Sequence, residues 1–190
     1  MEYSMIFYFH GFASSERSWK IDLLKKRLTT ETIIAPTLPV DPVEVVKLFE
    51  QVVVKNDKPG LVIGSSLGGF YAYYAASRFD IPAVLINPSI EPWITLKDHI
   101  GIHKRYYTGE SFEWKARYLD ALKKINDEID NYDPKHHRLH FFLSADDDVL
   151  DLSVIPGQFT GAGSIRFYDN CGHSFNRFAE IIPEIEQLLE

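Results

Sequence analysis

The sequence alternates between short apolar segments and helical segments, and this alternation limits the possible folds more than any other feature of the chain. Six segments rich in β-branched and aromatic residues have the length of strands, and they lie near residues 5–10, 32–36, 61–64, 83–87, 139–144 and 164–169. Most of them are continuously apolar, which is typical of strands covered on both faces. Strands separated by helices form right-handed βαβ units, so the sequence predicts a doubly wound, mostly parallel α/β sheet.

One of the intervening helices has a well-marked start. In the stretch DPVE, Asp41 can cap the free backbone N–H groups, Pro42 suits the first helical position and Glu44 can complete a capping box. We expect this helix to run to about Lys55.

The stretch from about 88 to 137 interrupts the alternation, since we expect one long helix and no strand there. Apolar residues within it recur at helical spacing and share one face, namely Trp114, Tyr118, Leu122, Ile125 and Ile129. We therefore predict a short helical insert that lies against the body of the protein. The length of 190 residues fits one domain, and we expect residues 1–190 to form it.

Charge and cysteine content exclude several classes of protein. The formal net charge of -7 and the scattered basic residues disfavour a nucleic-acid partner. The N-terminal segment MEYSMIFYFHGF has an acid where a signal peptide has a base, and its apolar run is too short for a membrane span. Cys171, the single cysteine, cannot form a disulfide within the chain. We expect a cytoplasmic protein that acts on a small molecule. The sequence does not determine its oligomeric state.

A candidate nucleophile lies in the segment VIGSSLGGF, where an apolar strand runs into a helix rich in small residues. The G-x-S-x-G turn holds a serine at a strained bend, and the residues two before and two after that serine must be small. Gly64 and Gly68 therefore identify Ser66, because choosing Ser65 would put an isoleucine and a leucine at the crowded positions. The alternative is a glycine-rich turn whose serines only cap the helix.

A base and an acid follow the serine in chain order. His173 comes after the sixth predicted strand, which is where such a fold places its catalytic histidine. The acid that orients the histidine is expected after the fifth strand, in SADDDVLD. We predict Asp147, because the recurring arrangement is an Asp, any residue, and then an apolar residue that packs into the core, here Val149. Asp146 and Asp148 remain alternatives.

When a serine attacks a carbonyl group, the oxyanion of the tetrahedral intermediate needs two N–H donors. Leu67 directly follows the serine and is expected to give one backbone N–H, and Phe12 in the segment HGF is expected to give the other. We expect His10 to shape this turn rather than act as a second base. A nucleophilic Cys171 is the alternative, but a small buried residue is the simpler interpretation. This chemistry needs no metal or organic cofactor.

The motifs FHGFASS, GSSLGG, DDDVLD and CGHSF, in this order, resemble those of the α/β-hydrolase superfamily. INPSIEP and YYTGE extend the similarity to the small bacterial YqiA-like esterases, over nearly the whole chain. The resemblance implies a compact α/β-hydrolase sheet of strand order 2-1-3-4-5-6 without the first antiparallel hairpin. It also implies hydrolysis of carboxylic esters or acyl thioesters, with Ser66, Asp147 and His173 as the triad.

The predicted function is a serine esterase or thioesterase that cleaves short to medium acyl groups through an acyl-enzyme intermediate. Candidates for the wall of an acyl pocket are the aromatic residues of the insert, namely Trp93, Tyr106, Tyr107, Phe112 and Trp114. Two alternatives remain: an acyltransferase with the same triad, and a hydrolase fold that has lost its chemistry and serves as an interaction module.

Overall fold

The computed structural model describes residues 4–56, 58–132 and 134–189. The first three residues lie outside this part of the chain. Glu2, the acid on which the argument against a signal peptide depends, is one of them.

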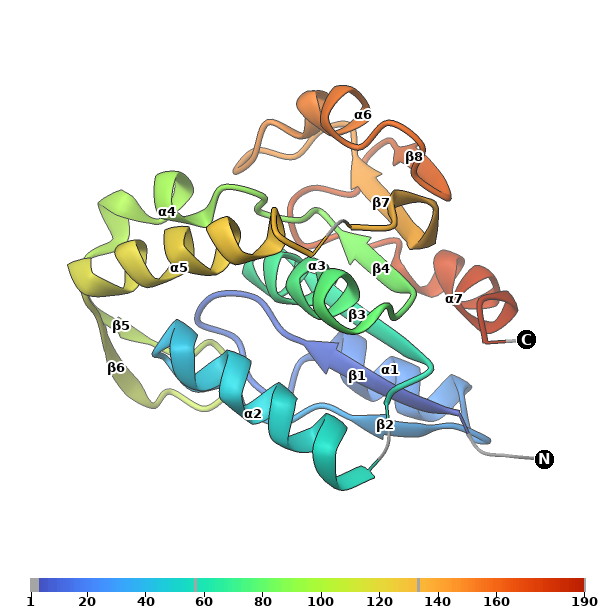
Figure 1. The fold of residues 1–190 in the computed structure, drawn as a ribbon, viewed down its shortest axis with the longest axis horizontal. Helices are drawn as coiled ribbons and strands as arrows, with labels where there is room; N and C mark the ends of the chain where they lie inside the picture. The colour runs from blue at the N-terminus through green and yellow to red at the C-terminus, as the bar shows by residue number, and fades with distance from the viewer. Residues whose placement is uncertain (1–3, 57, 133, 190) are drawn as a thin grey trace.

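Six parallel strands form the central sheet of the described chain, in the order β2-β1-β3-β4-β7-β8 (Figure 1). Their bounds are Met5–Phe9 for β1, Thr32–Ile34 for β2, Leu61–Ser65 for β3, Ala83–Ile86 for β4, Leu139–Ser144 for β7 and Ser164–Tyr168 for β8. Numbered in chain order among themselves, these strands give the order 2-1-3-4-5-6, so the predicted topology is confirmed.

Helices cover both faces of the sheet (Figure 1). Residues of α1 (Trp19–Arg27) and α7 (Phe178–Gln187) pack on one face, together with Ile63 and other residues of the strands. Residues of α2 (Pro42–Asn56) and α3 (Leu67–Phe79) pack on the other face. Because both faces are buried, the central strands β1, β3, β4 and β7 are mostly apolar along their length, whereas the edge strands β2 and β8 are partly exposed.

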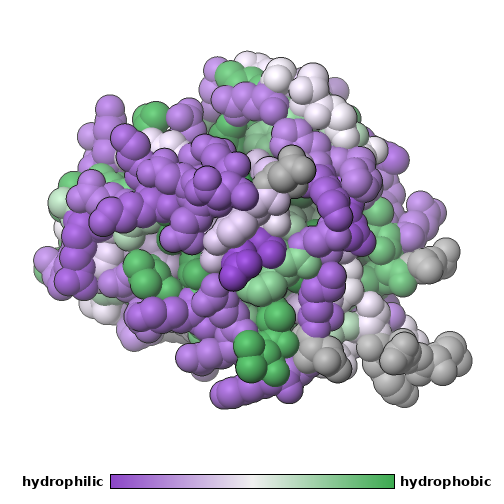
Figure 2. All heavy atoms as spheres, in the orientation of Figure 1, coloured by the Kyte–Doolittle hydropathy of each residue, from purple (hydrophilic) through white to green (hydrophobic). Residues whose placement is uncertain are grey.

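The remaining helical elements are short. They are α4 (Pro92–Thr95), η1 (Lys97–His99), η2 (His136–Arg138), η3 (Leu152–Val154) and α6 (Ile155–Gln158). None of the helices in the described part of the chain is both long and apolar enough to span a bilayer. On the side formed by α2 and α5 (Ala116–Ile129), the surface is mostly hydrophilic, with separate apolar patches (Figure 2).

The start of α2 agrees with the prediction from DPVE for Asp41 and Pro42. Glu44 does not complete a capping box in the described structure, because its carboxylate accepts a hydrogen bond of 2.9 Å from Lys47 instead. The side chain of Asp41 accepts a hydrogen bond of 3.0 Å from the backbone N–H of Val43, as a capping residue does. Pro42 is the first residue of the helix, and Asn56 is the last, one residue beyond the expected end.

The insert contains two strands, so the expectation of a purely helical insert is wrong. β5 (Gly101–Lys104) and β6 (Ser111–Trp114) form an antiparallel hairpin. The strands are four residues long, and Ile102 is 81% exposed, so neither strand has the buried apolar run by which the other strands were found. A two-stranded ribbon of this kind leaves little hydrophobic pattern in the sequence.

The predicted apolar face of the insert is confirmed. Tyr118, Leu122, Ile125 and Ile129 of α5 are all buried, and Trp114, at the end of β6, is buried beside them. Helix α5 packs against α2 and α3. The insert therefore lies on the body of the protein, at the carboxyl edge of the sheet where the candidate site residues lie.

Candidate active site

The bend between β3 and α3 holds Ser66 in an unusual backbone conformation. Its φ and ψ are 55° and -123°, in a region that non-glycine residues rarely adopt. A Cβ atom on Gly64 would overlap the carbonyl of Gly68, and a Cβ on Gly68 would overlap the carbonyl of Phe9. Both glycines are therefore required by the close approach of backbone to backbone, as the G-x-S-x-G interpretation assumes.

The structure brings the predicted serine, histidine and acid together. Nε2 of His173 lies 2.9 Å from Oγ of Ser66, and Nδ1 of His173 lies 2.8 Å from Oδ2 of Asp147. With a carboxylate beside Nδ1, that nitrogen carries the proton and donates it, so Nε2 is left to accept from the serine hydroxyl. This arrangement can remove the proton from Ser66 and stabilise the charged imidazole that results.

The environment of Asp147 keeps its carboxyl group ionised. The side chain is 1% exposed, and burial raises its pKa, but hydrogen bonds from His173 and from the backbone N–H groups of Leu150 and Val149 outweigh burial. The pKa of Asp147 is therefore below its ordinary value. The stated reason for choosing this residue is wrong, however, because Val149 is 61% exposed and does not pack into the core. Its neighbour Leu150 contacts the core instead.

The two other candidate acids have different positions. Oδ1 of Asp146 accepts hydrogen bonds from the hydroxyl of Ser144, at 2.7 Å, and from the N–H of Cys171, at 3.0 Å. Asp146 therefore joins the end of β7 to the loop that carries His173. In the described part of the chain no hydrogen bond of the Asp148 side chain is found. Of the three acids, Asp147 alone contacts the histidine.

The loop after β1 lies directly against Ser66. A Cβ atom on Gly11 would come within 3.3 Å of the Ser66 Cβ, which shows how closely the two segments approach. Neither the N–H of Phe12 nor the N–H of Leu67 has an acceptor among the described residues. The two predicted donors of the oxyanion hole thus flank the serine without a competing hydrogen bond.

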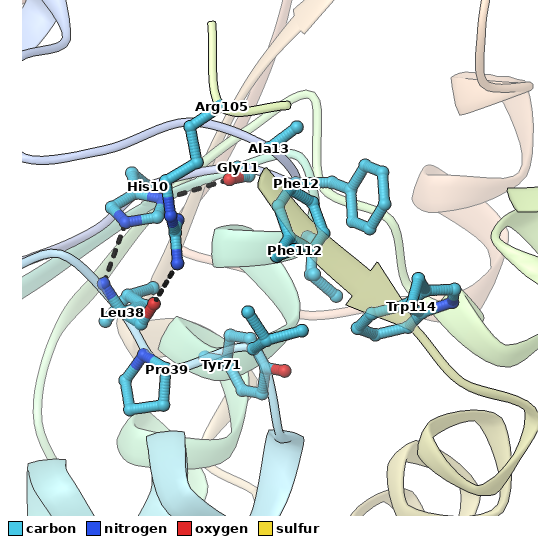
Figure 3. A pocket seen from close by; sticks show the side chains of 12 residues that line it. His10, Gly11, Phe12, Ala13, Leu38, Pro39, Tyr71, Arg105, Phe112 and Trp114 are labelled. Atoms are coloured by element: carbon cyan, nitrogen blue, oxygen red, sulfur yellow. Dashed lines mark hydrogen bonds between the residues drawn. The ribbon is translucent and has the colours of Figure 1, made fainter. Parts of the chain in front are cut away.

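His10 fixes the shape of this loop. It is 4% exposed, its Nδ1 donates to the Gly11 carbonyl and its Nε2 accepts from the N–H of Leu38, both at 2.9 Å (Figure 3). Burial lowers the pKa of His10 to about 4, so the ring is neutral at pH 7. Arg105 donates to the Leu38 carbonyl and to that of Ser14, and so anchors the insert to the same loop.

Asn87 is a site residue that sequence reasoning missed. It is fully buried at the end of β4, and its Nδ2 donates to the carbonyls of Gly172 and His173, at 3.1 and 3.0 Å. Its Oδ1 accepts from the N–H of Ser144, at 2.7 Å. Its place in INPSIEP, at the carboxyl end of a strand next to β3, is the signal that could have identified it.

Ser66 lines one hollow, and its neighbour Leu67 lines a second one. A cleft of about 300 Å³ contains Ser66 and His173 in its wall, together with Lys20, Tyr106 and Tyr107. A mostly apolar pocket of about 30 Å³ shares His10, Gly11 and Phe12 with this cleft. Its wall also includes Leu67 and, as Figure 3 shows, Tyr71, Arg105, Phe112 and Trp114. Of the five aromatic candidates for an acyl pocket, Trp93 lines a different hollow, with Tyr73 and Ile90.

Cys171 does not face the cleft. It is 1% exposed within the core cluster between the sheet, α1 and α7, and its thiol donates to the carbonyl of Tyr168 at 3.2 Å. Burial raises the pKa of this thiol. A buried thiol with a raised pKa is a poor nucleophile, so the structure favours the interpretation as a packed residue.

Residues 5–190 match the model of the Uncharacterised protein family (UPF0227). A UPF0227 protein of Shewanella baltica (strain OS185) is 22% identical, and the alignment covers 96% of this chain and 97% of the relative. A UPF0227 protein of Shewanella woodyi is 23% identical over the same shares.

Solved structures with the same architecture include several hydrolases. Est1E from Butyrivibrio proteoclasticus has a TM-score of 0.68 at 15% identity, over 99% of this chain and 89% of that one. The esterase domain from a Rhodothermus marinus protein has a TM-score of 0.70 at 19% identity, over 96% and 84%. Mouse alpha/beta hydrolase domain-containing protein 10 has a TM-score of 0.68 at 12% identity, over 98% and 90%. The chain therefore has the α/β-hydrolase fold.

Proposed function

The chain belongs to the UPF0227 family, and from the geometry of its site we propose that it is a serine hydrolase that cleaves carboxylic esters, thioesters included, through an acyl-enzyme intermediate. The observation that carries this proposal is the position of His173. It lies 2.9 Å from the Ser66 hydroxyl and 2.8 Å from the Asp147 carboxylate, at the bend where α/β hydrolases hold their nucleophile.

In the first half of the reaction, Ser66 is acylated. Nε2 of His173 takes the hydroxyl proton as Oγ of Ser66 attacks the ester carbonyl carbon, and Asp147 stabilises the imidazolium. The N–H groups of Phe12 and Leu67 donate to the oxyanion of the tetrahedral intermediate. The imidazolium then gives its proton to the alcohol oxygen, the bond between the carbonyl carbon and that oxygen breaks, and the alcohol leaves.

In the second half, water releases the acid. His173 takes a proton from a water molecule, whose oxygen attacks the acyl carbonyl while the same two N–H groups hold the oxyanion. The proton then returns to Oγ as the bond between Ser66 and the acyl group breaks. Every step uses groups of this chain, substrate and water alone.

The apolar pocket beside the oxyanion donors supports a short acyl group. Beside His10 and Arg105, its wall includes Leu67 and the aromatic side chains of Phe12, Phe112 and Trp114, which Figure 3 labels. A volume of about 30 Å³ has room for about two water-sized groups. The one or two carbons that follow the carbonyl in an acetyl or propanoyl group fit this space.

Hydrolysis of nitrophenyl acetate and butanoate by wild type and by Ser66→Ala tests this function. We expect Ser66→Ala to lower kcat by about 10⁴ or more, because a triad acts as a unit. The control is Ser77→Ala in the same helix, which should retain activity, because within the described residues the Ser77 hydroxyl bonds to the Tyr73 carbonyl alone. An active Ser66→Ala protein, or a folded wild type without turnover on either ester, would contradict the proposal. Acyl products formed with an added alcohol or amine would instead identify acyl transfer.

A further inference from the structure

Lys20 places a buried ammonium group in the wall of the catalytic cleft. It is the second residue of α1 and is 7% exposed. Its Nζ lies 3.4 Å from Oγ of Ser65, the neighbour of Ser66, and Lys20 lines the same cleft as Ser66 and His173. The charge therefore lies in the wall of the cleft, beside the residue that precedes the proposed nucleophile.

Lys20 has no counter-ion among the described residues; its Nζ contacts the Ser65 hydroxyl and lies 5.4 Å from the centroid of the Trp19 ring. Lys20 takes part in none of the ion pairs found in residues 4–56, 58–132 and 134–189, and its polar neighbour Ser65 is uncharged. Lysine is rarely buried without a partner, because an ammonium group loses its hydration there. Burial lowers the pKa of Lys20 to about 8, so the ammonium form still prevails at pH 7. An unpaired buried charge beside a catalytic serine indicates a ligand of opposite charge.

The rest of the cleft also favours an anion. Among its described wall residues Lys20 carries the positive charge and there is no aspartate or glutamate, although the whole chain carries a formal net charge of -7. Ser18 and Trp19, at the start of the nine-residue helix α1, line the cleft as well, and the N–H groups of a first helical turn attract negative charge. Hydroxyl groups of Ser14 and Ser174 add further donors.

The two hollows lie toward opposite faces of the sheet. Leu67 and Tyr71, in the wall of the small apolar pocket, belong to the core on the α3 side, whereas Lys20 belongs to α1 on the other side. If the acyl chain occupies the apolar pocket, the alcohol portion extends into the cleft. His173 also lines that cleft and must protonate the departing alcohol oxygen.

We propose that Lys20 binds an anionic group, a carboxylate or a phosphate, on the alcohol portion of the substrate ester. This inference rests on the proposed hydrolase function and specifies its substrate class, a short-chain acyl ester of an anionic alcohol. Lys20 is then a specificity residue that contacts the leaving group.

A pair of isosteric esters tests the charge requirement. The propanoyl ester of γ-hydroxybutyrate carries a carboxylate on its alcohol portion, and the propanoyl ester of γ-hydroxybutyramide carries a neutral amide of the same size. We expect wild type to prefer the anionic ester by at least about tenfold in kcat/KM, as one charge-assisted hydrogen bond provides. The propanoyl ester of hydroxypropyl phosphate then distinguishes phosphate from carboxylate by its rate relative to the first ester.

Variants of two lysines in α1 test whether Lys20 causes the preference for the anionic ester. Lys20→Met should lose this preference, with kcat/KM on the anionic ester lowered by at least about tenfold. Lys20→Arg should keep a large part of the preference, and Lys26→Met, at an exposed lysine of α1, should keep all of it and the wild-type rate on the neutral ester. Lys20→Met should also melt at or above the temperature of wild type, because it removes an unpaired buried charge. A folded Lys20→Met protein with an unchanged preference, or equal rates on both esters in wild type, overturns the proposal. A preference seen only with monopropyl glutarate, whose carboxylate lies on the acyl portion, also overturns it.

Binding measured without turnover separates this inference from the proposed function. In calorimetry with the Ser66→Ala protein, we expect the anionic ester to bind at least about tenfold more tightly than the amide, and Lys20→Met in that background to abolish the difference. If this selective binding is found and the wild type hydrolyses none of the esters, the hydrolase function is refuted and the anion site stands. Turnover of neutral esters without selective binding would refute the anion site and leave the hydrolase function standing.

Discussion

The loop that carries His173 depends on one buried amide, and removing that amide should cost both stability and rate. Asn87→Gly deletes the side chain that bonds to the carbonyls of Gly172 and His173 and to the N–H of Ser144. Glycine is the suitable replacement, because Asn87 has a φ of 41°, which an alanine would adopt only with strain.

The magnitude follows from the three hydrogen bonds. Loss of the acceptor leaves the buried N–H of Ser144 unsatisfied, at a cost of about 1–3 kcal/mol, and the two lost donor bonds add about 1 kcal/mol. We expect the free energy of unfolding to fall by about 3 kcal/mol. Because the His173 loop loses its anchor, kcat on activated esters should fall by about tenfold or more with a smaller change in KM.

Urea unfolding and steady-state kinetics test this prediction. The matched control is Asn170→Gly, which changes an exposed asparagine with a φ of 57° and no side-chain hydrogen bond in the described structure. Its free energy of unfolding should stay within about 0.5 kcal/mol of the wild-type value. If Asn87→Gly unfolds at the same urea concentration as Asn170→Gly and retains its kcat, the amide does not hold the loop and the reasoning is wrong.

Two further predictions concern charge. His10 binds a proton below pH 6.5 in the unfolded chain but only below about pH 4 when folded, because burial lowers its pKa, so the unfolded state binds more protons between these values. Stability should fall by about 3 kcal/mol as pH drops from 6.5 to 4, and urea titrations of His10→Gln should lack this loss. Asp147→Asn should lower kcat by about 10⁴, since the histidine loses its orienting carboxylate, whereas Asp148→Asn should leave kcat within about threefold of wild type. Similar rates for the two variants would contradict the assignment of the acid.

The sheet and its helices could be predicted because burial between them requires continuous apolar segments in the strands, and these segments are visible in the sequence. The six apolar segments coincide with six strands within a few residues, and the capping chemistry of Asp41 gave the start of α2. The hairpin of the insert was missed because its residues are largely exposed, as with Ile102, and exposed strands are under little hydrophobic constraint. The local pattern of apolar residues indicates which segments are buried, but it gives little indication of which exposed segments pair.

At the site, the sequence identified residues whose chemistry follows from short motifs. Ser66, His173 and Asp147 lie together as expected, but the argument for the acid relied on Val149 packing into the core, and Val149 is exposed. Asn87 and Lys20 were missed for a different reason. Each contacts residues distant in the sequence, 57 to 86 positions away for Asn87 and 45 for Lys20. The neighbouring residues do not specify these partners, and for Asn87 the one signal was its place at the carboxyl end of a strand.

Covalent labelling with a fluorophosphonate, followed by intact mass spectrometry and peptide mapping, tests the central claim most directly, because this reagent reacts with an activated serine whatever the natural substrate. We predict one adduct per wild-type chain, on Ser66, and none on Ser66→Ala or, over the same time, on His173→Ala. Folded wild-type protein that stays unlabelled, or that is labelled at Ser65 or Cys171 instead, would contradict the assignment of Ser66 as a nucleophile activated by His173.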